Sequence, residues 1–217
     1  MTTTGRAFVA TTAALFAALA SALCLSAAQA QAQTVIDEWA SVKVPPPPEL
    51  KPVTVDPKTT ALLMLDFMTQ NCGERPRCVA SIPAAKKLLD RARTAKVAVV
   101  VYAIITGTTT ADVIKDVAPR ADEPWIRSGA DKFINTDLEK ILKDKGVQTV
   151  IVTGTASNAA VLFTAAGAVQ RGMNAIVPVD AMSGIDAYAD LTTAYMLASA
   201  PVVSVNSTLT KIDMIKF

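Results

Sequence analysis

Four short, nearly continuous apolar runs constrain the fold of this chain more than any other feature. They lie at residues 60–67, 97–104, 147–152 and 174–179. Runs of this kind are typical of strands buried on both faces of a sheet, and segments with helical character separate them. Strands that alternate with helices predict a parallel sheet joined by right-handed crossovers. The predicted fold class is α/β: a three-layer α/β/α domain with a central, mostly parallel sheet of five or six strands and a Rossmann-like topology.

The segments between these runs predict the other elements. Helices are expected at 83–95, 136–145, 157–171 and 187–198, and a last strand at 202–205. Pro83 is expected in the first turn of its helix, where the missing N–H costs little. Residues 106–131 are polar and are interpreted as a long loop with a short helix at 111–117. Long loops in compact α/β domains are often functional.

The N-terminal residues predict a leader and an arm before the domain. Residues 1–30 combine Arg6, an Ala/Leu-rich core and an Ala-x-Ala cleavage site, which is typical of a secretory signal peptide. A membrane anchor is the alternative. We expect an exported protein of the bacterial periplasm. The proline-rich residues 31–58 predict an extended arm, lying across its own domain or a neighbouring subunit, and 59–217 the folded domain.

Charge and composition exclude several classes of function. The formal net charge is +2, with no Lys/Arg cluster, which argues against nucleic acid and, after signal cleavage, against a membrane surface as partners. The chain contains no His, which excludes Ser-His-Asp and Cys-His catalysis and His-based zinc sites. Proton transfer must then fall to Asp, Glu, Lys, Tyr or Cys.

Two cysteines, Cys72 and Cys78, remain after the predicted signal peptide. In an oxidising compartment a disulfide across this short loop is the expected outcome. The alternative is a reactive thiol at Cys72, which closely follows a strand end.

The segment 147–161, VQTVIVTGTASNAAV, predicts a strand, a turn at Gly154 and the start of a small-residue helix. Such a junction presents unpaired backbone N–H groups to a ligand. In parallel sheets the ligand lies at the carboxyl ends of the strands. Asp66, residues 104–107, the turn at 154–160 and Asp180 are all expected at that edge.

Four segments carry a resemblance to a known family. They are LMLDFMTQN at 63–71, DKFINTDLEKIL at 131–142, VIVTGTASNAAVLFTAAGAVQRG at 150–172 and NAIVPVDAMSG at 174–184. In order and spacing the chain resembles the isochorismatase-like, nicotinamidase-related cysteine hydrolases. The resemblance implies a catalytic Asp, Lys and Cys, with the thiolate attacking an amide carbonyl and two backbone N–H groups holding the oxyanion.

By this resemblance Asp66 matches the general base, although an Asp that caps the next turn is the alternative. The lysine matches either Lys132 or, by the family spacing, Arg127, and we favour Lys132. Ala160 matches the nucleophilic Cys, so the expected attacking atom is missing.

The residues of the turn follow from the same resemblance. A cis peptide is expected between Thr155 and Ala156, and the N–H groups of Ala156 and Ala160 match the oxyanion pair. Ser157 and Asn158 are expected to cap the helix or face the pocket. Trp125 and Phe133 flank a planar ligand or pack in the core. Zinc-binding relatives use His ligands, so we expect no metal, and no other cofactor.

Three accounts of Ala160 stay open. The residue is natural and the pocket binds a small carbonyl or carboxylate compound, or Cys72 has taken over, or a Cys→Ala substitution was introduced. The predicted function is an exported, hydrolase-like protein that acts on, or binds, a small amide or carbonyl compound. The alternative is a non-catalytic binding or assembly protein. In either case we expect a homo-oligomer.

Overall fold

The computed structural model describes residues 34–217. The predicted signal peptide, residues 1–30, lies outside the described residues, as do residues 31–33 of the predicted arm. The chain divides into two compact units between Pro45 and Pro46. In the first unit, residues 34–45 contain the short helix α2, Val35–Glu38. Within 34–217 no helix combines the length and apolarity needed to cross a membrane.

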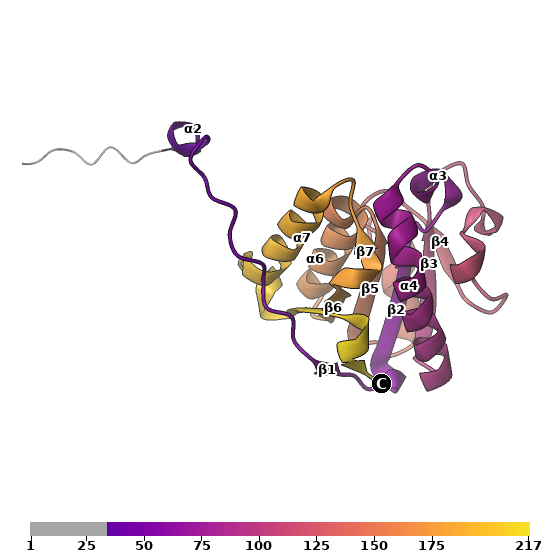
Figure 1. Ribbon diagram of the computed structural model, residues 1–217. Helices are drawn as coiled ribbons and strands as arrows, with labels where there is room; N and C mark the ends of the chain where they lie inside the picture. The colour runs from indigo at the N-terminus through magenta and orange to yellow at the C-terminus, as the bar shows by residue number, and fades with distance from the viewer. Residues whose placement is uncertain (1–33) are drawn as a thin grey trace, which may run out of the picture. The chain divides into compact units, whose positions relative to one another are not determined.

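A parallel sheet of seven strands forms the centre of the second unit, residues 46–217 (Figure 1). The strands are β2 (Thr60–Leu65), β3 (Val99–Ile104), β4 (Trp125–Arg127), β5 (Thr149–Thr155), β6 (Asn174–Pro178), β7 (Met182–Ser183) and β8 (Ser207–Thr210). Their order is β4-β3-β2-β5-β6-β8, and β7 pairs with the end of β5. The predicted fold class is therefore confirmed. The sheet has more strands than expected because β4 lies in the predicted loop 106–131 and β7 is a strand of only two residues.

Helices cover both faces of this sheet (Figure 1). The helices are α3 (Thr69–Cys72), α4 (Pro76–Ala95), α5 (Leu138–Asp144), α6 (Leu162–Gln170) and α7 (Ala187–Ser199). Alternate residues of β2 face opposite layers: Leu62 and Met64 share a core cluster with α4, whereas Leu63 and Leu65 share another with α5, α6 and α7. This period-two alternation explains the continuous apolar runs, because both faces of the strand are buried.

Helix α4 begins at Pro76 rather than at Pro83, which lies inside the helix. An interior proline removes a hydrogen bond and costs about 3 kcal/mol. The helix continues through it because one face is buried, including Ile82, Ala85 and Leu89. Tertiary packing here outweighs the local preference of proline for a helix start.

Two further predictions differ from the structure. Residues 202–205 do not form a strand: Val203–Val205 is a 3-10 turn, and the pairing strand β8 follows it. The apolar character of this segment does not lead to burial, since Val202 and Val205 are exposed. The short helix expected at 111–117 is instead two 3-10 turns, Thr110–Asp112 and Lys115–Val117.

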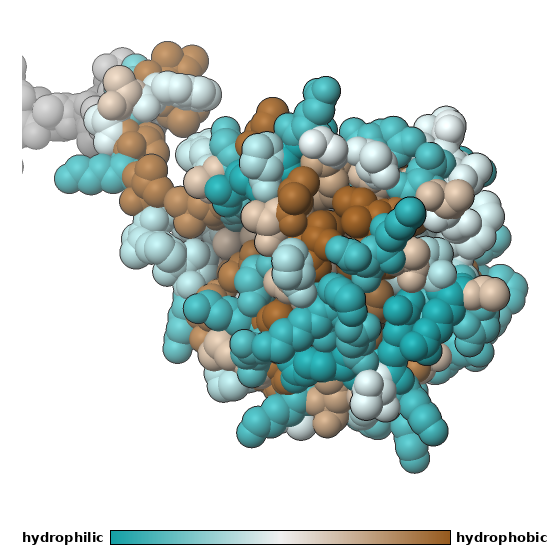
Figure 2. Space-filling view, turned by 45° about the vertical axis from the view of Figure 1, so that its right-hand side comes forward, coloured by the Kyte–Doolittle hydropathy of each residue, from teal (hydrophilic) through white to brown (hydrophobic). Residues whose placement is uncertain are grey.

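Residues 46–58 of the predicted arm pack on their own domain. Strand β1 (Val53–Thr54) pairs in parallel with β9 (Ile215–Lys216) near the C-terminus. The Lys51 N–H also donates a hydrogen bond to the Leu209 carbonyl, at 2.9 Å, on the edge strand β8. The face in Figure 2 mixes hydrophilic and hydrophobic side chains, and the hydrophobic ones gather mainly in its upper middle part.

Candidate functional site

A buried ion pair joins the two charged residues expected at the site. Lys132 Nζ donates a hydrogen bond of 2.6 Å to Asp66 Oδ2 and another of 2.7 Å to the Gly129 carbonyl. Lys132 is fully buried, and Asp66 is 5% exposed. A buried charge is tolerated only when it is paired and hydrogen-bonded, and this lysine meets both conditions.

Asp66 is held at the carboxyl edge of the sheet by its own backbone. It directly follows β2, and its N–H donates to the Ala103 carbonyl at 3.0 Å. Its carbonyl accepts hydrogen bonds from the Met68 N–H and from Asn71 Nδ2. With a φ of 55° the residue lies in the left-handed region, which Asp tolerates better than most residues. The backbone thus changes direction sharply at Asp66, and its hydrogen bonds fix the position of the carboxylate.

Contacts to α6 and to the following turn position Lys132. Its N–H donates to Thr164 Oγ1 of α6 at 3.3 Å. Its carbonyl accepts a hydrogen bond from the Thr136 hydroxyl. Asp131 Oδ1 accepts a hydrogen bond from the Phe133 N–H at 2.9 Å, which closes the turn around the lysine. The segment is therefore pinned on both sides of Lys132.

Burial disfavours the charged form of the Asp66 carboxyl, whereas Lys132 favours it. Burial raises the pKa of Asp66 above its ordinary value, whereas the charge and the hydrogen bond of Lys132 act in the opposite direction. The second carboxylate oxygen, Oδ1, is buried and has no hydrogen-bond partner in the protein. An unpaired buried oxygen of this kind can accept a proton or a hydrogen bond from a bound molecule.

The turn after β5 contains a cis peptide between Thr155 and Ala156. Gly154 precedes it and pairs with Leu65 of β2, so the residues that follow, Thr155 and Asp66, lie at the same edge of the sheet. A Cβ on Gly154 would lie 2.1 Å from the Leu65 carbonyl oxygen. The Thr155 hydroxyl donates to the Ser183 carbonyl of β7 at 3.0 Å.

A π-helical turn, Ser157–Val161, follows the cis peptide and leads into α6. Ala160 is buried in this turn, at 2% exposure. The side chains expected to cap the helix do not do so: no side-chain cap bond forms at its start. Asn158 is exposed, and the buried Ser157 hydroxyl has no partner. The N-cap position is Ala156, which has no polar side chain, and Ser157 and Asn158 lie inside the turn.

The other predicted residues lie apart from the ion pair. Lys132, and not Arg127, contacts Asp66: Arg127 is exposed and donates to the Thr108 carbonyl at 2.8 Å. Its guanidinium lies 5.4 Å from the centre of the Trp125 ring, which is 47% exposed. Phe133 is buried in the core, with the Arg171 guanidinium 4.3 Å from its ring centre. Of the two roles considered for Phe133, the structure shows packing in the core.

A cavity of about 550 Å³ opens beside the lysine segment. It is lined by Thr106, Arg127, Ser128, Gly129, Ala130, Asp131, Ile134, Asn135 and Phe163. Gly129 belongs both to this lining and to the hydrogen bonds of Lys132. The Ser128 hydroxyl is buried without a partner. Neither Ser128 nor the Gly129 carbonyl carries a sequence signal, because a serine and a backbone group in a polar loop are unremarkable.

Cys72 and Cys78 are joined by a disulfide, and both are fully buried. Residues 34–217 therefore contain no free thiol, and Cys72 has none with which to attack a substrate. The disulfide lies where α3 meets α4, next to Asn71, which contacts the Asp66 carbonyl. In the same range no three His, Cys, Asp or Glu side chains cluster as a metal site would require.

The fold and the site define a three-layer α/β/α protein with a lysine–carboxylate pair at the carboxyl edge of its sheet. The Isochorismatase domain family matches residues 60–207. The chain belongs to this family, which confirms the resemblance seen in its sequence.

Three known proteins illustrate the relationship. A nicotinamidase from Acinetobacter baylyi is 39% identical over 72 residues, which cover 32% of this chain and 34% of the relative, so the match spans about a third of that protein. An isochorismatase-like hydrolase from Alkaliphilus metalliredigens has a TM-score of 0.65 at 22% identity, over 73% of this chain and 96% of that one. A cysteine hydrolase from Pseudomonas syringae pv. phaseolicola has a TM-score of 0.65 at 21% identity, over 76% and 94%. At these identities the two solved structures show only that this chain has the same fold.

Proposed function

We propose that this protein binds a small amide or carbonyl compound beside the Asp66–Lys132 pair, without hydrolysing it through a cysteine. Ala160 stands where the family resemblance places the nucleophile, and a methyl group cannot attack a carbonyl. The resemblance to the nicotinamidase-related cysteine hydrolases implies that the thiol of that family attacks an amide carbonyl, so the proposed role is retained binding at a vacated site. The exported location expected from residues 1–30 is part of the same proposal.

The observation that carries the proposal is the unequal use of the two oxygens of Asp66. Lys132 holds Oδ2, whereas Oδ1 is buried without a partner. An unsatisfied buried polar atom costs roughly 1–3 kcal/mol, and a ligand that donates a hydrogen bond to Oδ1 would remove this cost. A ligand N–H, such as that of an amide, would donate to Oδ1.

The turn from Thr155 to Ala160 offers backbone N–H groups that would bind a carbonyl oxygen of the same ligand. Backbone N–H groups at the start of a helix attract a partial negative charge without any thiol. The N–H groups of Ala156 and Ala160 are the candidates by resemblance. An amide offers both an N–H and a carbonyl oxygen, which matches a carboxylate acceptor and backbone donors.

Thermal unfolding with a panel of ligands tests this proposal. We expect nicotinamide, other small amides or small carboxylic acids to raise the melting temperature of the wild type and to have less effect on Asp66→Asn. Asp144→Asn is the matched control, because Asp144 is exposed at the end of α5 and its ion pair with Lys140 lies on the surface. A flat response of the wild type across the panel would contradict the proposal.

The variant Ala160→Cys tests whether the site lacks only the thiol or has changed in other residues as well. Ala160→Cys should gain amidase activity towards the compounds that stabilise the wild type, because the base, the lysine and the turn are already present. The wild type should release no ammonia from the same compounds. Ammonia release by the wild type would show that a different chemistry, such as water activated by Asp66, operates.

Assembly is the second candidate, and the exposed apolar side chains of α7 favour it. Tyr188 is 70% exposed, Tyr195 44% and Met196 41%. Single exposed apolar residues are common on monomers, but three on one helix suit a subunit contact. Light scattering after size exclusion would detect the homo-oligomer. A stable oligomer together with no ligand response would favour assembly over binding.

A further inference from the structure

Only half of the outer edge of β3 is paired with another strand. Strand β4 pairs with Tyr102, Ala103 and Ile104 alone. The first half of the strand, Val99–Val101, pairs with β2 on its inner side. On its outer side no strand of the described chain pairs with these residues. A free strand edge offers backbone donors and acceptors to another polypeptide segment.

The backbone geometry shows which groups are free. The Tyr102 N–H donates to the Pro124 carbonyl at 3.0 Å, and the Ile104 carbonyl accepts from the Ser128 N–H, so both residues face the β4 side. Residues two apart along a strand point their N–H and C=O groups to the same side. Val100 therefore presents its N–H and carbonyl to the uncovered edge.

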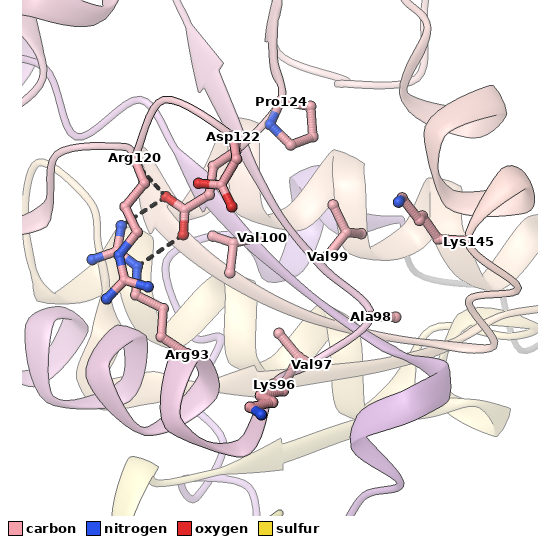
Figure 3. Close-up of a pocket in the computed structure, with 11 residues that line it drawn as sticks. Arg93, Lys96, Val97, Ala98, Val99, Val100, Arg120, Asp122, Pro124 and Lys145 are labelled. Atoms are coloured by element: carbon pink, nitrogen blue, oxygen red, sulfur yellow. Dashed lines mark hydrogen bonds and ion pairs between the residues drawn. The ribbon is translucent and has the colours of Figure 1, made fainter.

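A cavity of about 250 Å³ lies against this edge (Figure 3). Its lining comes from the start of β3, the end of α4, the loop before β4 and the end of α5 (Figure 3). The charged members are Arg93, Lys96, Arg120, Asp122, Glu123 and Lys145. Four positive and two negative side chains leave an excess of positive charge around a row of backbone groups.

One pair within this lining is already satisfied. Arg93 Nε donates to Glu123 Oε1 at 2.8 Å, and both side chains are largely buried. Lys96, Arg120 and Lys145 are exposed and form no ion pair within the described chain. Only Asp122 opposes these three cations in the lining. The charged side chains of the lining that form no ion pair therefore carry a net positive charge.

We propose that this edge is a docking site for an extended polypeptide segment with acidic side chains. The segment would add as a short strand beside Val100, whose N–H and carbonyl would pair with its backbone. Its acidic side chains would lie near Lys96, Arg120 and Lys145. The site is at the amino end of β3, opposite the edge that holds Asp66, so it operates independently of the proposed ligand site.

A compact anion fits the same cavity less well. Helices α4 and α5 end at Ala95 and Asp144, so the negative ends of their dipoles point toward this end of the sheet. Lys96 and Lys145 follow these ends directly and offset that negative potential. A phosphate ion gains only the remaining charge, whereas an extended segment also gains backbone hydrogen bonds.

The probe is a fluorescent, blocked peptide of about six residues that alternates Glu with Val. A peptide with Lys in place of Glu is its control. We expect the full-length protein to bind the acidic peptide, with an affinity that falls between about 20 and 200 mM salt. Hydrogen exchange at the Val100 N–H should slow when the peptide is bound. No binding, or unchanged exchange at Val100 in the bound state, would overturn the proposal.

Two sets of variants separate charge from strand pairing. Lys96→Glu with Lys145→Glu should weaken binding by about tenfold or more. Lys86→Glu with Lys140→Glu, on the helices that Lys96 and Lys145 follow but outside the cavity lining, should change it by less than about twofold. Val100→Pro removes the outward N–H without changing charge, and proline is tolerated where the N–H is not part of the ladder. It should also weaken binding by about tenfold.

Inorganic phosphate and tripolyphosphate identify the competing occupant. If they displace the peptide at low concentration and Val100→Pro binds it as the wild type does, the cavity is an anion site and the proposal fails. If Val100→Pro does not fold, hydrogen exchange at Val100 in the wild type decides the same question. Protection by the peptide and none by phosphate would support strand addition.

Discussion

Lys132 Nζ lies 2.6 Å from Asp66 Oδ2, although the two residues are 66 positions apart in the chain. Neither belongs to a strand or helix: Asp66 follows β2, and Lys132 lies in the segment between β4 and α5. Their contact connects the carboxyl edge of the sheet to the segment that packs on α6. The following predictions test this pair and the backbone around it.

Replacing Lys132 with Met should lower the free energy of unfolding by about 3–5 kcal/mol near neutral pH, because Asp66 would keep a buried charge without a partner. Urea denaturation measures the change. Lys140→Met, which breaks an exposed pair with Asp144, should cost less than about 1 kcal/mol. Equal stability of Lys132→Met and the wild type would mean that the pair does not form in solution.

Asp66 should make the stability depend on pH with a specific sign. Burial raises the pKa of Asp66 in the folded state above its ordinary value of 3.8. Between 3.8 and the raised pKa the folded protein binds the proton more tightly than the unfolded chain, so stability falls as pH rises through this window. Asp66→Asn lacks this contribution.

The unfolding free energy of the wild type minus that of Asp66→Asn should therefore decrease as the pH rises through the window, and it should stay constant at higher pH. In Lys132→Met the window should extend to higher pH, because the charge that lowers the pKa of Asp66 is gone. Denaturation curves over a pH series, with a carboxyl titration by NMR, measure both effects. An Asp66 pKa below 3.8 would contradict the assignment of burial as the dominant cause.

Gly154→Ala should destabilise the protein by at least about 3 kcal/mol. Its φ of 131° is unfavourable for any side chain, and the new Cβ would lie 2.1 Å from the Leu65 carbonyl oxygen. Gly129→Ala is the control, since no atom lies within 4 Å of the position of its Cβ. Thermal unfolding of both variants gives the comparison, and similar melting temperatures would contradict the close approach of β5 to β2.

Removal of the disulfide, by Cys72→Ala with Cys78→Ala, should lower the unfolding free energy by about 2 kcal/mol, because the closed loop is short. A reducing agent should destabilise the wild type and leave this variant unchanged. Thiol titration of the processed, unfolded protein should find no free cysteine. A titration of two thiols would contradict the pairing.

Much of the fold could be predicted from the sequence, since burial on both faces leaves a continuous apolar run in each central strand. The helix predicted at 83–95 has the correct C-terminal end, Ala95, but it starts earlier, at Pro76, because Pro83 is a local signal that buried packing overrides. Strands β4 and β7 were missed because three-residue and two-residue strands leave no periodic pattern. The apolar residues near Val202 were misread because apolarity alone does not determine burial.

The sequence by itself determined that Asp66 ends a buried strand and that Ala160 occupies a small-residue turn, since both follow from neighbouring residues. Only the tertiary structure decided that Lys132 rather than Arg127 reaches the carboxylate, and that the Gly129 carbonyl shares the lysine. These contacts depend on the path of a long loop over α6. No local pattern encodes that path, because it is set by packing between segments far apart in the chain.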